Sequence, residues 1–154
     1  MLDSIPTAWS ALSVKQPWAA LILGGAKTID VRTWTTGQRG PFLLHAAKID
    51  DPRPEGWALV TTPELTAYSE LRGGIVGTAE LVEIVEYGNA DSFARDAESH
   101  LNAPDWFRPP RLYGFRFANI RPLPFRRFPG NTFFFPVPGI RIEPPEGPAT
   151  EAAA

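Results

Sequence analysis

The sequence predicts an α+β fold: a small, partly open mixed β-barrel of five to six strands with two to three short helices. Several segments alternate apolar and polar residues with a period of two, as strands with one buried face do. In residues 75–85 this alternation slips between Leu81 and Val82, which is typical of a strand that bends at the side of a barrel. The 154 residues contain no internal repeat and suit one core rather than two domains.

The amino-terminal part predicts a short strand and then a short helix. Residues 1–10 lack periodicity and are expected to form a flexible lead-in, and residues 11–14 form the strand. Pro17 suits the first turn of a helix, where its missing N–H has no partner to lose. Trp18 begins the apolar face of this helix and is expected to be a core residue, and the Gly24-Gly25 pair ends the helix.

Two strands are expected next. Residues 28–34 alternate with a period of two, so that Ile29 and Val31 share one face. The other face carries the polar and aromatic residues Thr28, Asp30, Arg32 and Trp34. Such a face suits a cleft better than a core, and Trp34 is therefore expected to face a ligand. After a turn, residues 41–47 form a buried strand that carries His45.

The remaining elements alternate between helices and strands. In order, they are a helix at 63–71 capped by Thr61 or Thr62, the strand at 75–85, a helix from Asp91 to about Leu101, a strand at 112–120, an edge segment with Pro122 and Pro124, and a last strand at 133–137. From residue 143 the chain is rich in Pro, Ala and Glu and is expected to be a disordered tail. The predicted domain therefore spans residues 11–142.

The net charge of −2 conceals a strong segregation of charge along the chain. Residues 1–48 carry +3, residues 49–105 carry −9, and residues 106–142 carry seven arginines and no acid. Each block taken alone could be an ordinary solvated surface. If the fold brings the two basic segments together, they form a cationic groove, which is typical of a protein that binds nucleic acid.

The composition excludes several classes of protein. The absence of cysteine excludes disulfides and cysteine-based zinc or redox chemistry, and two histidines are too few to predict a metal site. No cofactor is expected. No run approaches the roughly 18 apolar residues of a membrane span, and no signal peptide is recognisable, so a cytoplasmic protein without membrane contact is expected.

Residues 12–48 combine many cations and indoles with a single acid, Asp30. A small core does not need these side chains, whereas cations beside indoles suit a phosphate with its base. The residues expected to contact nucleic acid are Lys15, Gln16, Lys27, Arg32, Trp34, Arg39, Lys48 and, from the second basic segment, Arg116.

Three residues are candidates for catalysis if the protein is an enzyme: Lys27, Asp30 and His45. Lys27 could act as a base of lowered pKa, with Asp30 as an orienting carboxylate. Equally, Asp30 and Arg32 could form an ion pair that orients a ligand. His45 lies within an apolar strand, where a histidine is usually a hydrogen-bonded core residue and less often a general base.

Five segments resemble the ASCH domain family, which shares the PUA-like β-barrel fold. They are LSVKQPW (12–18), GAKTIDVRTW (25–34), RGPFLLHAAK (39–48), GGIVGTAELVEIV (73–85) and FPGNTFFFPV (128–137), and the resemblance covers residues 11–138. It implies a nucleic-acid-binding module whose site lies between the QPW helix and the K-T-x-D-x-R strand. The residues that match the two motifs are Gln16, Pro17, Trp18, Lys27, Asp30 and Arg32.

The resemblance also bears on enzymatic activity. Some small bacterial proteins of this fold are amidohydrolases of acetylated cytidine nucleosides, and some are described as ribonucleases. The amidohydrolases use a lysine, a threonine three residues later and a distant glutamate; Lys27 matches the lysine, but Asp30 stands in place of the threonine. This departure disfavours the amidohydrolase and leaves RNA cleavage by Lys27 or His45 open.

We therefore expect an RNA-binding protein, or a protein that binds single-stranded nucleic acid or a nucleotide-like anion. The alternatives are a hydrolase of RNA or of a modified nucleoside, which needs no metal, and a module that binds proteins or a small anionic ligand.

Overall fold

A single six-stranded sheet organises the chain in the computed structural model, which describes residues 8–139. The elements, in order, are β1 (Ala8–Val14), α1 (Trp18–Leu23), β2 (Ile29–Arg32), β3 (Gly40–Ala46), α2 (Pro54–Trp57), α3 (Pro63–Ser69), β4 (Gly74–Tyr87), α4 (Ala90–Arg95), α5 (Ala97–His100), the 3₁₀ turn η2 (Pro104–Trp106), β5 (Leu112–Arg127) and β6 (Phe134–Pro138).

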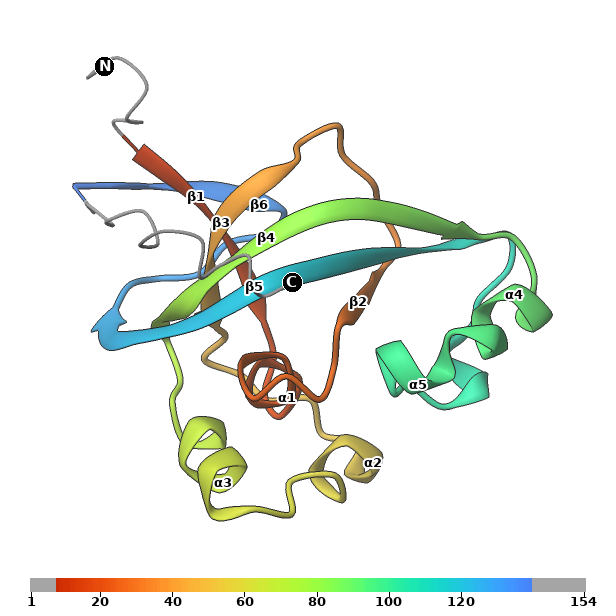
Figure 1. Ribbon diagram of the computed structural model, residues 1–154, viewed down its shortest axis with the longest axis horizontal. Coiled ribbons are helices and arrows are strands. Elements are labelled where there is room, and N and C mark those ends of the chain that lie inside the picture. The colour runs from red at the N-terminus through yellow and green to blue at the C-terminus, as the bar shows by residue number, and fades with distance from the viewer. Residues whose placement is uncertain (1–7, 140–154) are drawn as a thin grey trace.

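The sheet has the strand order β2-β5-β4-β3-β1-β6 and curls into a half-barrel (Figure 1). The pair β1–β3 is parallel, and every other neighbouring pair is antiparallel. Five to six strands with short helices were predicted, so the α+β half-barrel confirms the predicted fold class.

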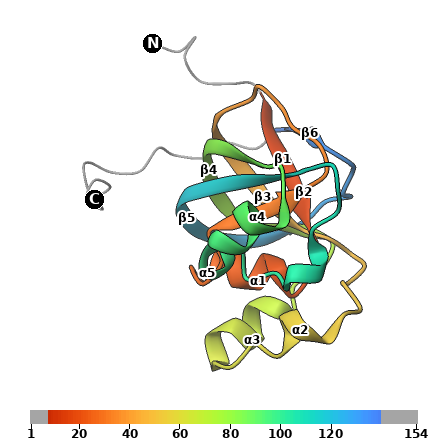
Figure 2. The same cartoon turned by 90° about the vertical axis from the view of Figure 1, so that its right-hand side faces the viewer.

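Helix α1 fills the space between the curled sheet and α3, as the two perpendicular views agree (Figures 1 and 2). All six of its residues are buried, and the helix belongs to the main hydrophobic core. Burying so short a helix on all sides leaves no exposed polar face, which explains why its sequence, WAALIL, is entirely apolar. The helix ends at Gly24, whose Cα lies so close to Leu65 of α3 that a Cβ would be 2.6 Å from the leucine Cδ2.

Strand β4 is irregular where the sequence pattern slips. Its register against β5 shifts between Leu81 and Glu83, and two further shifts precede this one. The extra residues let the long β4–β5 pair curve around the core. The irregularity predicted between Leu81 and Val82 is therefore confirmed, as a shift in strand register.

Strand β5 is longer than predicted, because it continues from Ile120 to Arg127. Pro122 and Pro124 are tolerated there because β2 pairs only with residues 113–116, which leaves one side of the later part of β5 without a neighbouring strand.

The helices after β4 differ from the prediction in number and in capping. One helix from Asp91 to about Leu101 was expected, but α4 and α5 are separated at Asp96. Asn89 rather than Asp91 caps α4, since its Oδ1 accepts a hydrogen bond from the Ser92 N–H. The cap on α3 is Thr62, one of the two predicted residues.

The ends of the predicted domain are described in part. Strand β1 begins at Ala8, inside the range expected to be a lead-in, because its first residues pair with β6. The expected tail at 143–154 lies outside the described residues. Within residues 8–139, no helix has the length and apolar character needed to cross a bilayer.

Candidate functional site

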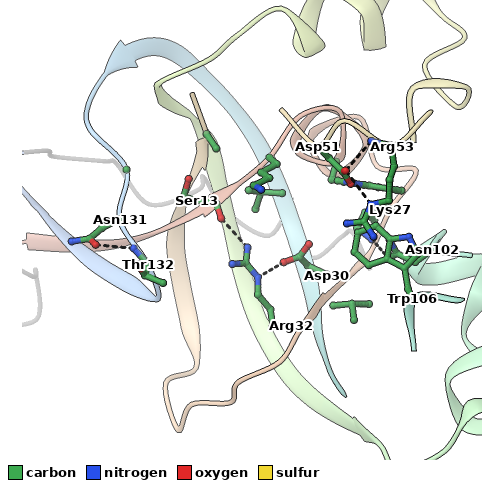
Figure 3. A pocket seen from close by; sticks show the side chains of 16 residues that line it. Ser13, Lys27, Asp30, Arg32, Asp51, Arg53, Asn102, Trp106, Asn131 and Thr132 are labelled. Atoms are coloured by element: carbon green, nitrogen blue, oxygen red, sulfur yellow. Dashed lines mark hydrogen bonds and ion pairs between the residues drawn. The ribbon is translucent and has the colours of Figure 1, made fainter. Parts of the chain in front are cut away.

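A cavity of about 610 Å³, here called the main cavity, opens between α1, β2 and the segments that follow β3 and α5. Trp18 of α1 and Lys27, Asp30 and Arg32 from the segment that includes β2 line it. Further lining residues are Ser13 and Lys15 from the end of β1, Asp51 and Arg53 after β3, Asn102 and Trp106 after α5, and the 130–132 loop. Figure 3 shows Arg32 at Ser13 and Asp30, with Lys27, Arg53, Asn102 and Trp106 gathered further along.

Lys27 is a buried cation at the wall of this cavity, with 2% of its surface exposed. Its backbone N–H is bonded to Leu21 of α1. Its Nζ donates to the His100 carbonyl and, at 2.8 Å, to Asn102 Oδ1. Nζ also lies 4.7 Å from the centre of the Trp18 ring. Burial lowers the pKa of Lys27 to about 8, although the negative charge of Asp30 acts in the opposite direction.

Asp30 and Arg32 form an ion pair along β2. Arg32 Nε lies 2.6 Å from Asp30 Oδ2, and Arg32 Nη2 donates to the Ser13 carbonyl at 2.8 Å. The pair that the two-residue spacing suggested is therefore present. It fixes the guanidinium at the cavity wall and connects β2 to the end of β1.

Asp51 joins two aromatic residues of the cavity to a cation. Its Oδ2 accepts from Trp18 Nε1 at 2.8 Å, and its Oδ1 accepts from the backbone N and the Nε of Arg53. The Arg53 guanidinium in turn stacks 3.6 Å from the centre of the Trp106 ring. Burial alone would raise the pKa of Asp51, but the hydrogen bonds from Trp18 and Arg53 outweigh it, and the pKa lies below its usual value.

Sequence reasoning missed four of these residues: Asp51, Arg53, Asn102 and Trp106. Asp51, Arg53 and Asn102 fall in the acidic middle segment, and Trp106 is the first residue of the second basic segment. No nucleic-acid contact was expected at these positions. One signal was available, because Asp51 follows a buried strand directly and polar residues at strand ends often line sites. The contact between Lys27 and Asn102 spans 75 residues and has no local signature.

The predicted nucleic-acid contacts lie in different places. Lys15, Lys27 and Arg32 line the main cavity. Trp34 instead lines a neighbouring cavity of about 420 Å³, here called the side cavity. It is half-buried, with its ring against Phe115 and other phenylalanines.

The other four predicted contacts line neither cavity. Gln16 is buried beneath α1, where Ala20 N donates to its Oε1 and its Nε2 donates to the carbonyls of Tyr68 and Leu71. Arg39 donates to carbonyls of its own turn. Lys48 is exposed, and Arg116 is paired with Glu83 of β4.

His45 is a core residue that does not line the main cavity itself but contacts Ser13 and Gly130, which do. Its Nε2 lies 2.7 Å from the Phe128 carbonyl, which can only accept, so Nε2 carries the proton. Its Nδ1 then accepts from the Ser13 hydroxyl at 2.9 Å. Burial lowers the pKa of His45, so the ring is neutral at neutral pH. Gly130 packs so closely that a Cβ there would lie 2.8 Å from His45 Cε1.

Within the described part of the chain, no three His, Asp or Glu side chains come close enough together to hold a metal ion. The acids of the main cavity are occupied by arginine and tryptophan donors.

Comparison with known proteins identifies the family. A model of the ASCH domain matches residues 12–123, most of the described chain. The chain belongs to the ASCH domain family. The main cavity of this ASCH domain lies between the two segments, LSVKQPW and GAKTIDVRTW, that resemble the family motifs.

Solved structures support the fold. This ASCH domain is similar to the crystal structure of ASCH from Zymomonas mobilis, with 17% identity, a TM-score of 0.53, and coverage of 77% of this chain and 72% of that chain. A mutant of the Zymomonas mobilis protein in which phenylalanine replaces a tyrosine gives 17% identity and a TM-score of 0.54, with coverage of 77% of this chain and 74% of that chain. At this identity the likeness concerns the fold. The comparison with curated proteins gave no match.

Proposed function

We propose that this ASCH domain binds RNA, or another single-stranded nucleic acid, and takes one base into the main cavity. The observation that carries the proposal is a cavity of about 610 Å³ that combines two indoles with polar groups of both signs. Ligand sites commonly have volumes of about 300–1,000 Å³. An unpaired base needs a flat apolar surface together with hydrogen-bond donors and acceptors, and the cavity supplies both.

The donors and acceptors are held in place before any ligand binds. Asn102 Oδ1 is occupied by Lys27, whereas the Asn102 amino group has no partner within residues 8–139 and is free to donate. Asp30 and Asp51 are each fixed by an arginine. Such preorganisation reduces the entropy lost when a ligand is ordered in the site.

Phosphates would contact the cations at the cavity wall. Lys15 is exposed and forms no ion pair among the described residues. The side chain of Arg53 is 48% exposed, and only its Nε is engaged by Asp51. These two side chains are suited to phosphate contacts that set the position of a strand without reading its sequence.

Trp106 provides the test, because it lines the main cavity and is half-buried. We expect Trp106→Ala to weaken binding of a labelled single-stranded RNA by about 1–3 kcal/mol, the usual scale for one stacked base. Trp106→Phe should keep most of the affinity, because an aromatic face remains. The measurement is fluorescence anisotropy at low salt.

Trp9→Ala is the matched control. Trp9 is another half-buried indole, but it lies on β1 against a second core cluster around Leu43 and Val137, and it lines neither cavity. Unchanged RNA affinity in Trp106→Ala, or an equal loss in Trp9→Ala, would show that the main cavity is not where the base binds. Absence of RNA binding by the wild-type protein at low salt would refute the proposal as a whole.

A second candidate function is hydrolysis of RNA in the same cavity. Lys27, with a pKa of about 8, and the hydroxyl of Ser13, bonded to neutral His45, both line it. A lysine of lowered pKa and a hydroxyl beside a base are groups that nucleophilic or general-base catalysis uses. Cleavage of end-labelled RNA that Ser13→Ala or Lys27→Met abolishes would support it, and intact RNA after long incubation with excess protein would exclude it.

A further inference from the structure

The main cavity and the side cavity share a wall. Val31, Arg32, Arg53 and Trp106 line both of them. Because four residues border both spaces, the two cavities are adjacent. The two cavities with their shared wall are here called the groove, and each cavity is one of its compartments.

The two compartments differ in charge. Asp30 and Asp51 line the main cavity together with its cations. The side cavity is lined by Arg32, Arg53 and Arg108, and no acid lines it in the described part of the chain. Arg108 is exposed and forms no ion pair among these residues. The side cavity therefore offers a phosphate one unpaired cation, Arg108, with no acid beside it in the described lining.

The side cavity also offers flat apolar surface. Trp34 lines one part of it and is held edge-on by Phe115 and Phe133, with ring centres 5.1 and 4.9 Å away. Trp106 lines another part, and its Nε1 is fixed by a 2.8 Å hydrogen bond to Glu55. Indoles anchored in this way lose little freedom when a base packs on them.

We propose that the groove takes at least two successive nucleotides of a single strand. One base lies in the main cavity, and the connecting phosphate contacts Arg32 and Arg53. The next nucleotide lies in the side cavity at Trp34 and Arg108. This inference rests on the proposed function and specifies its ligand. It assigns the chain to strands rather than to free nucleosides or mononucleotides. The main cavity would hold the first base, the two arginines of the shared wall would hold the phosphate, and the side cavity with Trp34 would hold the second base.

The test compares ligands of one and two nucleotides. The probes are the four nucleoside monophosphates and the four homodinucleotides, and the dinucleotides carry a terminal phosphate at one end or the other. Binding is measured by quenching of tryptophan fluorescence and by calorimetry. We expect the best dinucleotide to bind at least about 10-fold more tightly than its mononucleotide, because it adds a charge-assisted contact and a second stacked base.

Arg108→Gln separates the compartments. It should weaken dinucleotide binding about five-fold or more and leave mononucleotide binding within about two-fold, since only the second nucleotide reaches Arg108. Arg121→Gln is the matched control, because Arg121 is exposed on β5 and lines neither cavity. It should change neither affinity.

The outcomes distinguish this inference from the function on which it rests. Two results would overturn the two-compartment groove and leave base binding in place. One is equal affinity for mono- and dinucleotides, and the other is an Arg108→Gln variant that changes neither affinity or changes both equally. Absence of binding for mononucleotides, dinucleotides and longer RNA would remove the proposed function itself.

Discussion

At the residue scale, Lys27 shows how one side chain links fold and site. Its ammonium ties the end of α5 to the start of β2, because it donates to both His100 and Asn102. The same group lines the main cavity beside Trp18 and Asp30. A lysine so enclosed holds its proton less firmly than usual, since burial penalises the charged form.

The lowered pKa of Lys27 predicts a pH dependence of RNA binding. Below a pKa of about 8 the ammonium adds a positive charge to the cavity, and above it this charge is lost. We therefore expect the affinity for RNA to fall several-fold between pH 7 and about pH 9. His45 and His100 do not contribute in this range, because burial lowers their pKa values below the usual 6.5. Anisotropy titrations at a series of pH values measure the effect.

Lys27→Met is the control for this prediction, since it keeps an apolar stem without a titrating group. Its affinity should be lower at pH 7 and nearly constant as the pH rises. Because the pKa of Lys27 is lower in the folded than in the unfolded state, the stability of the wild type relative to this variant should increase above about pH 8. An equally steep loss of affinity in the variant would assign the pH dependence to another group.

Trp18 and Trp34 differ in what their removal should do. Trp18 is 5% exposed, contacts the core and donates to Asp51, so Trp18→Ala should lose about 3–5 kcal/mol of unfolding free energy. The strand pattern predicted that Trp34 faces a ligand rather than the core. Because its ring packs against three phenylalanines, we now expect a moderate loss of about 1–3 kcal/mol together with weaker RNA binding. Urea denaturation and anisotropy on both variants measure these effects, and a larger stability loss for Trp34→Ala would reverse the assignment.

At the element scale, the sequence pattern predicted those elements whose side chains have a regular period. The buried strand of His45 follows from its continuous apolar run, and the irregularity in β4 follows from the break in its alternation. The Thr62 cap follows from local hydrogen-bonding chemistry. Elements fixed by distant contacts were missed. Helix α2 and the turn η2 have only four and three residues, and the hydrogen bond from Trp106 to Glu55 joins them across 51 residues.

Gln16 illustrates the limit for the site as well. A polar residue beside Pro17 and Trp18 suggested a contact with nucleic acid, but its amide bonds α1 to the end of α3. The sequence could not distinguish these roles, because both require an amide at this position. Lys15 and Arg32, in contrast, line the main cavity together with Lys27, and their contact with nucleic acid stays a prediction.

Gln16→Ala should therefore destabilise the fold without changing the ligand site. It leaves the Leu71 carbonyl and the Ala20 N–H without their side-chain partner and removes one of the two donors to the Tyr68 carbonyl. We therefore expect a loss of about 2–4 kcal/mol in unfolding free energy. RNA affinity measured well below the melting temperature should remain within about two-fold. A stable variant with weak RNA binding would return Gln16 to the ligand contacts. Gln38→Ala, in the exposed turn before β3, is the control.

At the scale of the whole molecule, the segregation of charge along the chain is partly cancelled in the fold. The two basic segments do adjoin, because β2 pairs with β5. The other neighbour of β5 is β4, from the acidic segment, and it neutralises Arg111 with Glu86 and Arg116 with Glu83. Six of the seven arginines of residues 106–142 lie within residues 8–139. These six therefore do not form one continuous cationic face, and of them only Arg108 lines the main or the side cavity.

This cancellation sets the expected salt dependence of RNA binding. The exposed or partly exposed cations that line the groove are Lys15, Arg32, Arg53 and Arg108, so about two to four phosphates should be neutralised. For single strands, raising the salt from about 50 to about 200 mM should then weaken binding by roughly 10-fold, within a range of about 7- to 50-fold. Fluorescence anisotropy across this salt range gives the slope of log affinity against log salt concentration directly.

Two variants are the controls for this slope. Arg108→Gln should reduce the slope by less than one phosphate equivalent, and Arg121→Gln should not change it. A slope near zero would mean that the groove binds no phosphate. A slope several times steeper would mean that arginines outside the groove contact the strand, and that the ion pairs between β4 and β5 open when RNA binds.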